Sequence, residues 1–171
     1  YQKIKRFPVD KIHDEFIWAA KNKIDEIQLA DANFGIFKER DMELAKTFVE
    51  TKSSYGYPWS LSTAWTKNSN LTVLSIAELL HKADALRMFQ IAIQTFNESS
   101  LSAVKRSNMA SNKYDEIISE VHKRNMPYGT DLILGLALET YDSWIDTMDQ
   151  VCESDAWFHL SPLQILVNSE N

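Results

Sequence analysis

The chain has 171 residues, a formal net charge of −6 and one cysteine. This length suits one domain with a substantial core, and the acidic balance argues against a general binder of nucleic acids or anionic membranes. No apolar run reaches the roughly 20 residues of a membrane span. The lone Cys152 rules out a disulfide framework or a cysteine metal site within these residues, so we expect a soluble, cytoplasmic protein.

The first half alternates helical and strand patterns. Pro8 suits the first turn of a helix, because that turn leaves amide groups without intrahelical partners. Ile27 and Leu29 alternate with polar residues, as in a half-buried strand. The expected elements are a helix over 8–23, a strand over 24–31, a helix over 39–52, a strand over 57–64 and a helix capped by Asn70. The buried face of this last helix is expected to carry Val73, Ala77 and Leu80.

The second half continues the alternation. Asn97 and Thr140 suit helix N-caps, since their side-chain oxygens can accept from backbone amides. Tyr141, Ile145, Met148 and Cys152 recur at helical spacing, which predicts the buried stripe of the last helix, with Cys152 as a small core residue. The expected elements are a strand over 86–94, helices over 97–105 and 112–125, a strand over 128–135, a helix from 140 and a strand over 158–166.

Strands separated by helices predict an α/β fold with a parallel sheet and right-handed crossovers. The spacing favours an incomplete barrel over an open doubly wound sheet, although periodicity alone does not separate them. No linker or low-complexity segment divides the chain. We therefore expect residues 1–171 to form a single incomplete (β/α) barrel domain.

Polar side chains gather just after the predicted strands. In a parallel barrel these points share one face, where such folds bind ligands. For each position the alternative is a helix cap, which is as common. The set comprises Asp31, Asn33, Thr63, Lys67, Gln94, Asn97, Glu139 and Asn168.

Other motifs argue against common chemistries. There is no Gly-rich phosphate loop and no nucleophile elbow. The four histidines lack paired ligand spacing, which favours solvent-facing positions, including that of His159. Most tryptophans are expected in packing contacts. These motifs therefore identify no catalytic residue, and we predict no metal ligand.

Several short stretches resemble the radical S-adenosylmethionine (radical SAM) enzymes, in the branch that often carries an upstream cobalamin-binding domain. Asp131-Leu-Ile-Leu-Gly135 followed by Glu139 resembles one strand exit, as does the run from Gln94 to Asn97. Residues 31–36 with Arg40 and Asp41 resemble the second-strand exit, and residues 162–166 the sixth. The resemblance runs from the first helix to the sixth strand and implies a partial TIM-like barrel whose first strand is missing.

The family carries three cysteines after its first strand, and their thiolates hold a 4Fe-4S cluster. This motif would be expected immediately upstream of Tyr1. Cys152 cannot replace it. The resemblance thus implies a fragment that begins just after the cluster loop and is inactive by itself.

Carried over by position, the resemblance assigns the cofactor contacts. Asp31 and Asn33 would lie near the methionine amino group, and Thr63 and Lys67 near its carboxylate or the substrate. The remaining assignments are Gln94 and Thr95 by the ribose, Gly135 beside the adenosine, and Leu166 and Val167 flanking the adenine.

Three details qualify these assignments. Glu139 is expected to brace its loop and not to touch substrate. Ala137 and Leu138 stand where the family has a Pro-Gly pair. Val167 stands where the family has a proline.

Three functions follow as hypotheses. The first is a fragment of a radical SAM enzyme, in which a 5′-deoxyadenosyl radical abstracts hydrogen from an unknown substrate or assists a cobalamin-dependent methylation. The second is a non-catalytic binding or scaffold module without a cluster. The third is an ordinary barrel enzyme using Asp31, Lys67 and Glu139 as acids and bases. A missing first strand would also open one barrel edge, and an open edge favours a homodimer.

Overall fold

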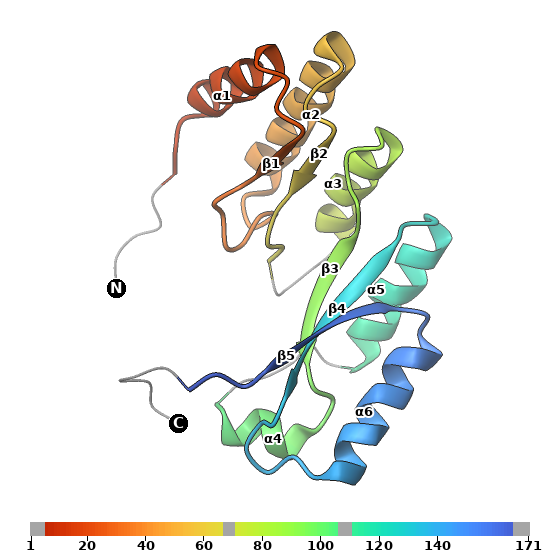
Figure 1. Cartoon of the computed structure of the whole chain (residues 1–171). Coiled ribbons are helices and arrows are strands. Elements are labelled where there is room, and N and C mark those ends of the chain that lie inside the picture. Colours follow the sequence, from red (N-terminus) through yellow and green to blue (C-terminus); the bar gives the residue numbers. More distant parts are fainter. Residues whose placement is uncertain (1–5, 67–70, 106–110, 166–171) are drawn as a thin grey trace. The chain divides into compact units, whose positions relative to one another are not determined.

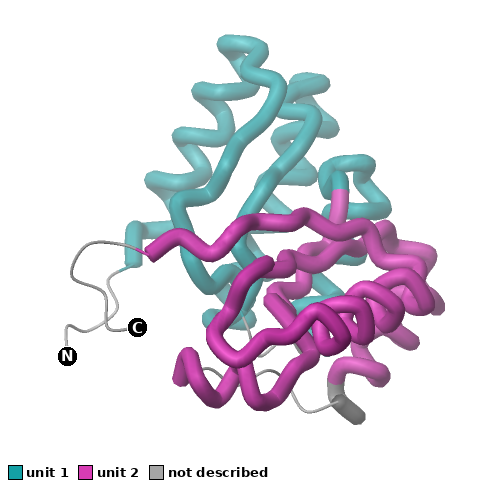
Figure 2. Tube along the Cα trace, turned by 60° about the horizontal axis from the view of Figure 1, so that its bottom comes forward, with its two compact units in different colours: residues 1–87 teal, residues 88–171 magenta. Residues whose placement is uncertain are grey.

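A computed structural model describes residues 6–66, 71–105 and 111–165 (Figure 1). Contacts divide the chain into two compact units, Tyr1–Arg87 and Met88–Asn171, which Figure 2 colours separately. Each unit is described on its own below. Within the described ranges, no helix has the length and apolar character to cross a membrane.

Unit 1 contains a parallel pair of short strands with helices around it. In this pair Ile27 lies opposite Leu61. The pairing is parallel, so both strands end at the same edge, as the alternation of elements predicts. The described elements are α1 (Val9–Lys21), β1 (Glu26–Gln28), α2 (Lys38–Tyr55), β2 (Ser60–Ser62) and α3 (Leu71–Lys82).

The core of unit 1 comes from the apolar faces of its helices. Phe16 of α1 meets Phe48 of α2 edge to face, with ring centroids 5.3 Å apart. Val73, Ala77 and Leu80 of α3 are fully buried, which confirms the predicted face of that helix. Burying side chains of this size is the main stabilising contribution in such a layer.

Unit 2 contains a three-stranded sheet in the order β3-β4-β5, with both pairings parallel. Right-handed crossovers place successive connecting helices on the same side of a sheet, and Figure 1 shows α5 and α6 on one side. The described elements are β3 (Phe89–Gln94), α4 (Glu98–Ala103), α5 (Ser111–Lys123), β4 (Tyr128–Leu134), α6 (Tyr141–Glu153) and β5 (Trp157–Pro162).

The two faces of this sheet differ in burial. Ile91, Ile93 and Leu132 point to one face and are buried. The alternate residues include Asp131 of β4 and His159 of β5, which are partners in the register and belong to the opposite face. The side chains of Asp131 and His159 remain 42% and 71% exposed.

Two of the three predicted helix caps, Asn97 and Thr140, are confirmed, and the third, Asn70, lies outside the described residues. The Ser100 amide donates to Asn97 Oδ1 over 3.0 Å at the start of α4. The Ser143 amide donates to Thr140 Oγ1 over 3.2 Å, and the Thr140 amide donates to Ser143 Oγ over 2.9 Å. These two bonds form a capping box, in which each side chain satisfies an amide of the other residue.

The buried stripe of α6 differs from the prediction. Thr147 and Val151 are buried, whereas Tyr141 and Cys152 are exposed. The predicted core position of Cys152 is therefore wrong. The helix instead buries the stripe that contains Thr147, whose hydroxyl accepts the Phe96 amide over 3.3 Å. This contact joins distant segments of the chain, so the periodicity does not reveal it.

The tryptophans also depart from expectation. Trp65 packs against Phe34 with ring centroids 5.7 Å apart and is buried. Trp59 is exposed but stacks on Tyr57, with ring centroids 5.4 Å apart. Trp18 and Trp157 are 63% and 74% exposed, so the predicted packing role fails for these two.

Candidate functional site

The loop after β1 is held by a buried carboxylate. Asp41, which is fully buried in the first turn of α2, accepts from the Gly35 amide over 2.8 Å and from the Phe37 amide over 3.1 Å. Gly35 has φ +98, and a Cβ there would lie 2.8 Å from Val73 Cγ2. A glycine is needed at this turn because both its backbone angle and the available space exclude a side chain.

Asp31 and Asn33 lie at the start of this loop. The Asn33 amide donates to Asp31 Oδ1 over 2.9 Å, which forms a local turn. Asp31 is half-buried and Asn33 is exposed. Both side chains thus follow the carboxyl end of β1 in a loop whose backbone is anchored at Asp41.

Arg40 connects this loop to the buried carboxylate. Its Nη1 lies 2.8 Å from Asp41 Oδ1 and 3.9 Å from Asp31 Oδ2. The guanidinium therefore offsets the charges of two carboxylates. Its Nε is buried and has no hydrogen-bond partner in the structure. A buried donor without a partner is costly, which makes this atom a candidate for a water or ligand contact.

The exit of β2 adds a hydroxyl at the same sheet edge. Thr63 follows β2 directly, and its Oγ1 is buried without a hydrogen-bond partner. The backbone around it is fixed, because the Phe34 amide donates to the Ala64 carbonyl over 2.9 Å and the Thr66 amide to the Phe34 carbonyl over 3.0 Å. Lys67, the other predicted residue of this exit, lies outside the described residues.

Gln94 ends β3 in an unusual backbone conformation. Its φ is +73, and the register with β4 shifts between Ala92 and Gln94. A side-chain-bearing residue in the left-handed region is strained by roughly 1–3 kcal/mol, and such residues gather at binding sites. The bulge turns the half-buried Gln94 out of the regular alternation of the strand.

Thr95 has an internal role. Its side chain is fully buried, and its hydroxyl donates to Glu139 Oε1 over 2.9 Å. It also accepts from the Asn97 amide over 3.1 Å and lies 3.3 Å from Thr147 Oγ1. The expected bracing role of Glu139 agrees with this contact, which joins the exits of β3 and β4 to α6.

The second oxygen of Glu139 is the remaining unsatisfied atom of this network. Oε2 is buried and has no hydrogen-bond partner in the structure. A carboxylate oxygen without a donor in a buried place attracts an N–H or O–H group from water or ligand.

Gly135 leaves room at the end of β4. It has φ +89, and no atom lies within 4 Å of a Cβ built there. Its backbone is therefore open to a close approach, as expected for a ligand wall. Three residues later Leu138 has φ +61 and is exposed, in the segment where the family would have a Pro-Gly pair.

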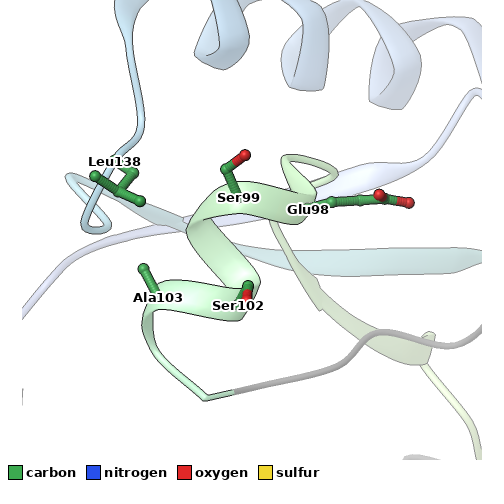
Figure 3. A pocket seen from close by; sticks show the side chains of 5 residues that line it. All are labelled: Glu98, Ser99, Ser102, Ala103 and Leu138. Carbon is green, nitrogen blue, oxygen red and sulfur yellow. The ribbon is translucent and has the colours of Figure 1, made fainter.

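One shallow pocket lies beside this turn. It has a volume of about 430 Å³, and Figure 3 shows Leu138 facing α4 across it while Glu98 points away. None of the predicted cofactor residues lines it. Its lining consists of Glu98, Ser99, Ser102, Ala103 and Leu138.

The structure brings the predicted residues together within each unit. Asp31, Asn33 and Thr63 follow the paired strands β1 and β2 at their common edge. Gln94 is the last residue of β3, and Gly135 directly follows the paired strand β4. Leu166 and Val167, like Lys67, fall outside the described ranges, so those three positions rest on the sequence.

The residues present do not suit an iron–sulfur cluster. Such a cluster needs several cysteine thiolates, and the chain has only Cys152, exposed in the last turn of α6. Among the described residues, no group of three His, Cys, Asp or Glu side chains could hold a metal ion. Within unit 1, Thr63 Oγ1 and Arg40 Nε are polar atoms that could contact an organic ligand, and within unit 2 the backbone at Gly135 is open to one.

Sequence reasoning missed two supporting residues. Asp41 was part of a motif, but its two bonds to loop amides follow from the fold. Thr147 gave no signal, because a threonine within a helix is ordinarily a neutral surface residue. The available clue was its spacing, because Thr147 lies four positions before Val151 and so shares its face of the helix, which is buried.

Comparison with known proteins gives two curated relatives. The chain is 30% identical over 151 residues to the cobalamin-dependent radical SAM methyltransferase TokK of Streptomyces tokunonensis. It is 29% identical over 151 residues to the 2-(S-pantetheinyl)-carbapenam-3-carboxylate methyltransferase of Streptantibioticus cattleyicolor. Each match covers 88% of this chain and 22% of the relative, so the chain spans about a fifth of their length. No family model matches the chain.

Solved structures agree on the fold. The radical SAM methyltransferase TsrM of Kitasatospora setae, determined with cobalamin and a [4Fe-4S] cluster bound, matches with a TM-score of 0.68 at 16% identity, covering 92% of this chain and 29% of TsrM. Coproporphyrinogen III oxidase (HemN) of Escherichia coli matches with a TM-score of 0.69 at 16% identity, covering 92% of this chain and 37% of HemN. The α/β fold with parallel strands is thus that of the partial barrels of radical SAM enzymes.

Proposed function

We propose that this chain is the S-adenosylmethionine-binding part of a cobalamin-dependent radical SAM methyltransferase. The premise is its homology to enzymes of that kind. The observation that carries the proposal is the match to TokK, which extends over 88% of the chain. Methyl transfer to an unknown small molecule is the reaction of the whole protein that this match favours, with hydrogen abstraction as the alternative outcome of the same cofactor.

The loop after β1 would bind the methionine end of the cofactor. Asp31 offers a carboxylate and Asn33 an amide oxygen, both suited to an ammonium group. Arg40, which lies 2.8 Å from the buried Asp41, is also 3.9 Å from Asp31 and helps to orient that carboxylate. Thr63 offers its unpaired hydroxyl to the carboxylate of the cofactor or to the substrate, and Lys67 would act beside it.

The exits of β3 and β4 would hold the nucleoside end. Gln94, turned outward by its bulge, would reach the ribose, and Thr95 would keep that turn in place through its bond to Glu139. Gly135 would let the adenosine approach the backbone. Leu166 and Val167 would flank the adenine.

The reactive groups come from outside these residues. In enzymes of this kind the bound cofactor supplies a methyl group or a 5′-deoxyadenosyl radical, and the protein supplies binding, orientation and exclusion of water. The chain has no set of cysteines for a 4Fe-4S cluster, and cobalamin would require a further domain. We therefore expect the isolated chain to bind S-adenosylmethionine without cleaving it.

Calorimetric titration tests the binding. Wild-type protein should bind S-adenosylmethionine, and Asp31→Asn should weaken binding about tenfold, since the loss of one charge-assisted contact is worth about 1.4 kcal/mol. Glu43→Gln removes an exposed carboxylate from α2 and should leave binding unchanged. Absence of saturable binding by the folded wild-type chain would contradict the proposal.

Anaerobic reconstitution tests whether the isolated chain lacks catalytic activity. After incubation with iron and sulfide and reduction by dithionite, we expect no 5′-deoxyadenosine by mass spectrometry. Formation of 5′-deoxyadenosine by this chain alone would show that the missing ligands are not needed.

A second candidate is a non-catalytic barrel module that has lost the cluster. Sequencing the gene upstream of the Tyr1 codon separates the two. A Cys-x3-Cys-x2-Cys run supports the enzyme, and a complete reading frame without it supports the module. In either case we propose a cytoplasmic location, where a reduced thiol is the normal state.

A further inference from the structure

One face of the β3–β4–β5 sheet carries a row of interacting polar side chains. Gln90 Nε2 donates to Asp131 Oδ1 over 2.8 Å, and His159 Nδ1 lies 3.7 Å from the same oxygen. Ser161 Oγ lies 3.4 Å from His159 Nδ1. The row therefore crosses all three strands, and none of its members belongs to the cofactor residues assigned above.

This face is open, which is unusual for a parallel sheet. Parallel strands ordinarily bury both faces. Here the opposite face holds the buried Ile91 and Leu132, while the side chains of Asp131 and His159 are 42% and 71% exposed. A polar row on an accessible face is available to a ligand.

An apolar platform borders the row. Trp157 is two residues before His159 on β5, so it belongs to the same face, and it is 74% exposed. Its register partner is Gly129, where a Cβ would lie 2.6 Å from Met88 Sδ. The missing side chain at Gly129 thus makes room for the thioether of Met88.

The charges of the strands select the ligand. Among the residues of β3, β4 and β5, Asp131 is the only acidic one, and Lys and Arg are absent. A carboxylate that shares one oxygen with Gln90 and His159 favours a cationic or N–H donor group. An exposed indole adds cation–π attraction to such a group or stacks against an apolar part beside it.

We propose that Asp131, His159 and Trp157 bind an amino group of the substrate, together with the apolar part attached to it. The proposal rests on the proposed function for the identity of that ligand as the substrate. Asp131 holds the ammonium, Gln90 and His159 orient the carboxylate, and Trp157 covers the adjoining carbon atoms.

Benzylamine serves as the probe, since it joins an ammonium to an apolar ring, and benzyl alcohol is its neutral counterpart. Fluorine NMR of the full chain labelled with 5-fluorotryptophan reports on Trp157, whose signal is assigned with Trp157→Phe. We expect a saturable shift of that signal with benzylamine and binding at least about tenfold weaker with benzyl alcohol, as the loss of a charge-assisted contact implies.

Variants locate the contact. Asp131→Asn keeps an acceptor for Gln90 but removes the charge, and it should weaken benzylamine binding about tenfold. Asp149→Asn makes the same change at an exposed position of α6 and should have no effect. If Asp131→Asn does not fold, as judged by its amide spectrum, His159→Gln provides the second test and should also weaken binding.

The outcomes are distinct. Equal binding of both probes, unchanged binding by Asp131→Asn or His159→Gln, or no shift at Trp157 would overturn the proposal. S-adenosylmethionine is titrated in parallel. Its binding without that of benzylamine would overturn this inference alone, and benzylamine binding without S-adenosylmethionine would support the amine site while contradicting the proposed function.

Discussion

Asp41 is buried where its two oxygens meet two loop amides and a guanidinium. Asp41→Asn should lower the free energy of unfolding by about 2–3 kcal/mol, because an amide nitrogen in place of one oxygen leaves a backbone N–H or Arg40 without its acceptor. Urea unfolding measures this loss, and Glu43→Gln on the same helix is the matched control. A loss no larger than that of the control would mean that Asp41 does not anchor the loop.

Gln94 allows backbone strain to be separated from side-chain function. Gln94→Ala and Gln94→Gly both remove the side chain, but only glycine relieves the positive φ. We expect the glycine variant to be more stable than the alanine variant by about 1 kcal/mol in urea unfolding. At Gln90, which precedes the bulge in the regular part of the same strand, the order should reverse, since Gln90→Gly removes a Cβ that Gln90→Ala keeps. An alanine variant at position 94 as stable as the glycine variant would disprove the strain.

Single residues were predictable where their effect is local. Asn97 and Thr140 cap the next helix with their own side chains, so the sequence pattern contains the whole interaction. The bonds of Asp41 to loop amides four and six residues away depend on how the loop folds back. Thr95 was assigned to the ribose through the family resemblance, and only the structure shows its hydroxyl bonded to Glu139.

Two buried tyrosines connect α5, β4 and the end of α6. Burial raises the pKa of Tyr114 and of Tyr128, and Tyr128 donates to the Ser154 carbonyl. Because the folded protein holds these protons more tightly than the unfolded chain, stability is full below the ordinary tyrosine pKa of 10.0. It should fall as the pH rises above that value.

Urea unfolding at about pH 8 and about pH 10.5 measures this dependence. The midpoint should drop at the higher pH, and the drop should be smaller in Tyr128→Phe, which removes one of the two ionisations. Tyr141→Phe, at an exposed position of α6, should behave like the wild type. An equal drop in Tyr128→Phe and wild type would rule out the tyrosine linkage.

The type and order of the helices and strands were predictable from the sequence. Which face of each helix is buried was less predictable. The alternation of helices and parallel strands follows from the apolar spacing, and α3 buries the expected residues. In α6 the spacing allowed two neighbouring stripes, and contacts from Phe96 and Thr95 to Thr147 decide between them. Strand lengths depend on the pairing partner, so β1 covers three residues of the predicted 24–31.

At the scale of the whole molecule, β5 ends its sheet in the described structure and exposes apolar residues. An edge strand offers unpaired amides and carbonyls to another chain. We expect a homodimer whose fraction rises with concentration in light scattering, and Leu160→Lys should shift it toward monomer. Trp18→Lys, at an exposed site on α1, should not. A monodisperse monomer over the accessible concentration range would contradict dimerisation through this edge.

That residues 1–171 form a single domain stays a prediction. The sequence shows no linker, while contacts divide the chain near residue 87 into two compact units. Composition does not reveal this division, because Arg87 and Met88 lie at the entrance of a regular strand and carry no Pro, Gly or Ser signal. The cofactor assignments remain proposals for the same reason, since each unit holds only part of them.

Amide chemical-shift mapping with S-adenosylmethionine locates the cofactor site on the chain. We expect saturable shifts at Asn33, Gly35 and Gly135, at the carboxyl ends of β1 and β4, with little change along the outer face of α6. The absence of saturable shifts, or shifts confined to α6 and the surface pocket at α4, would contradict a cofactor site at the strand exits.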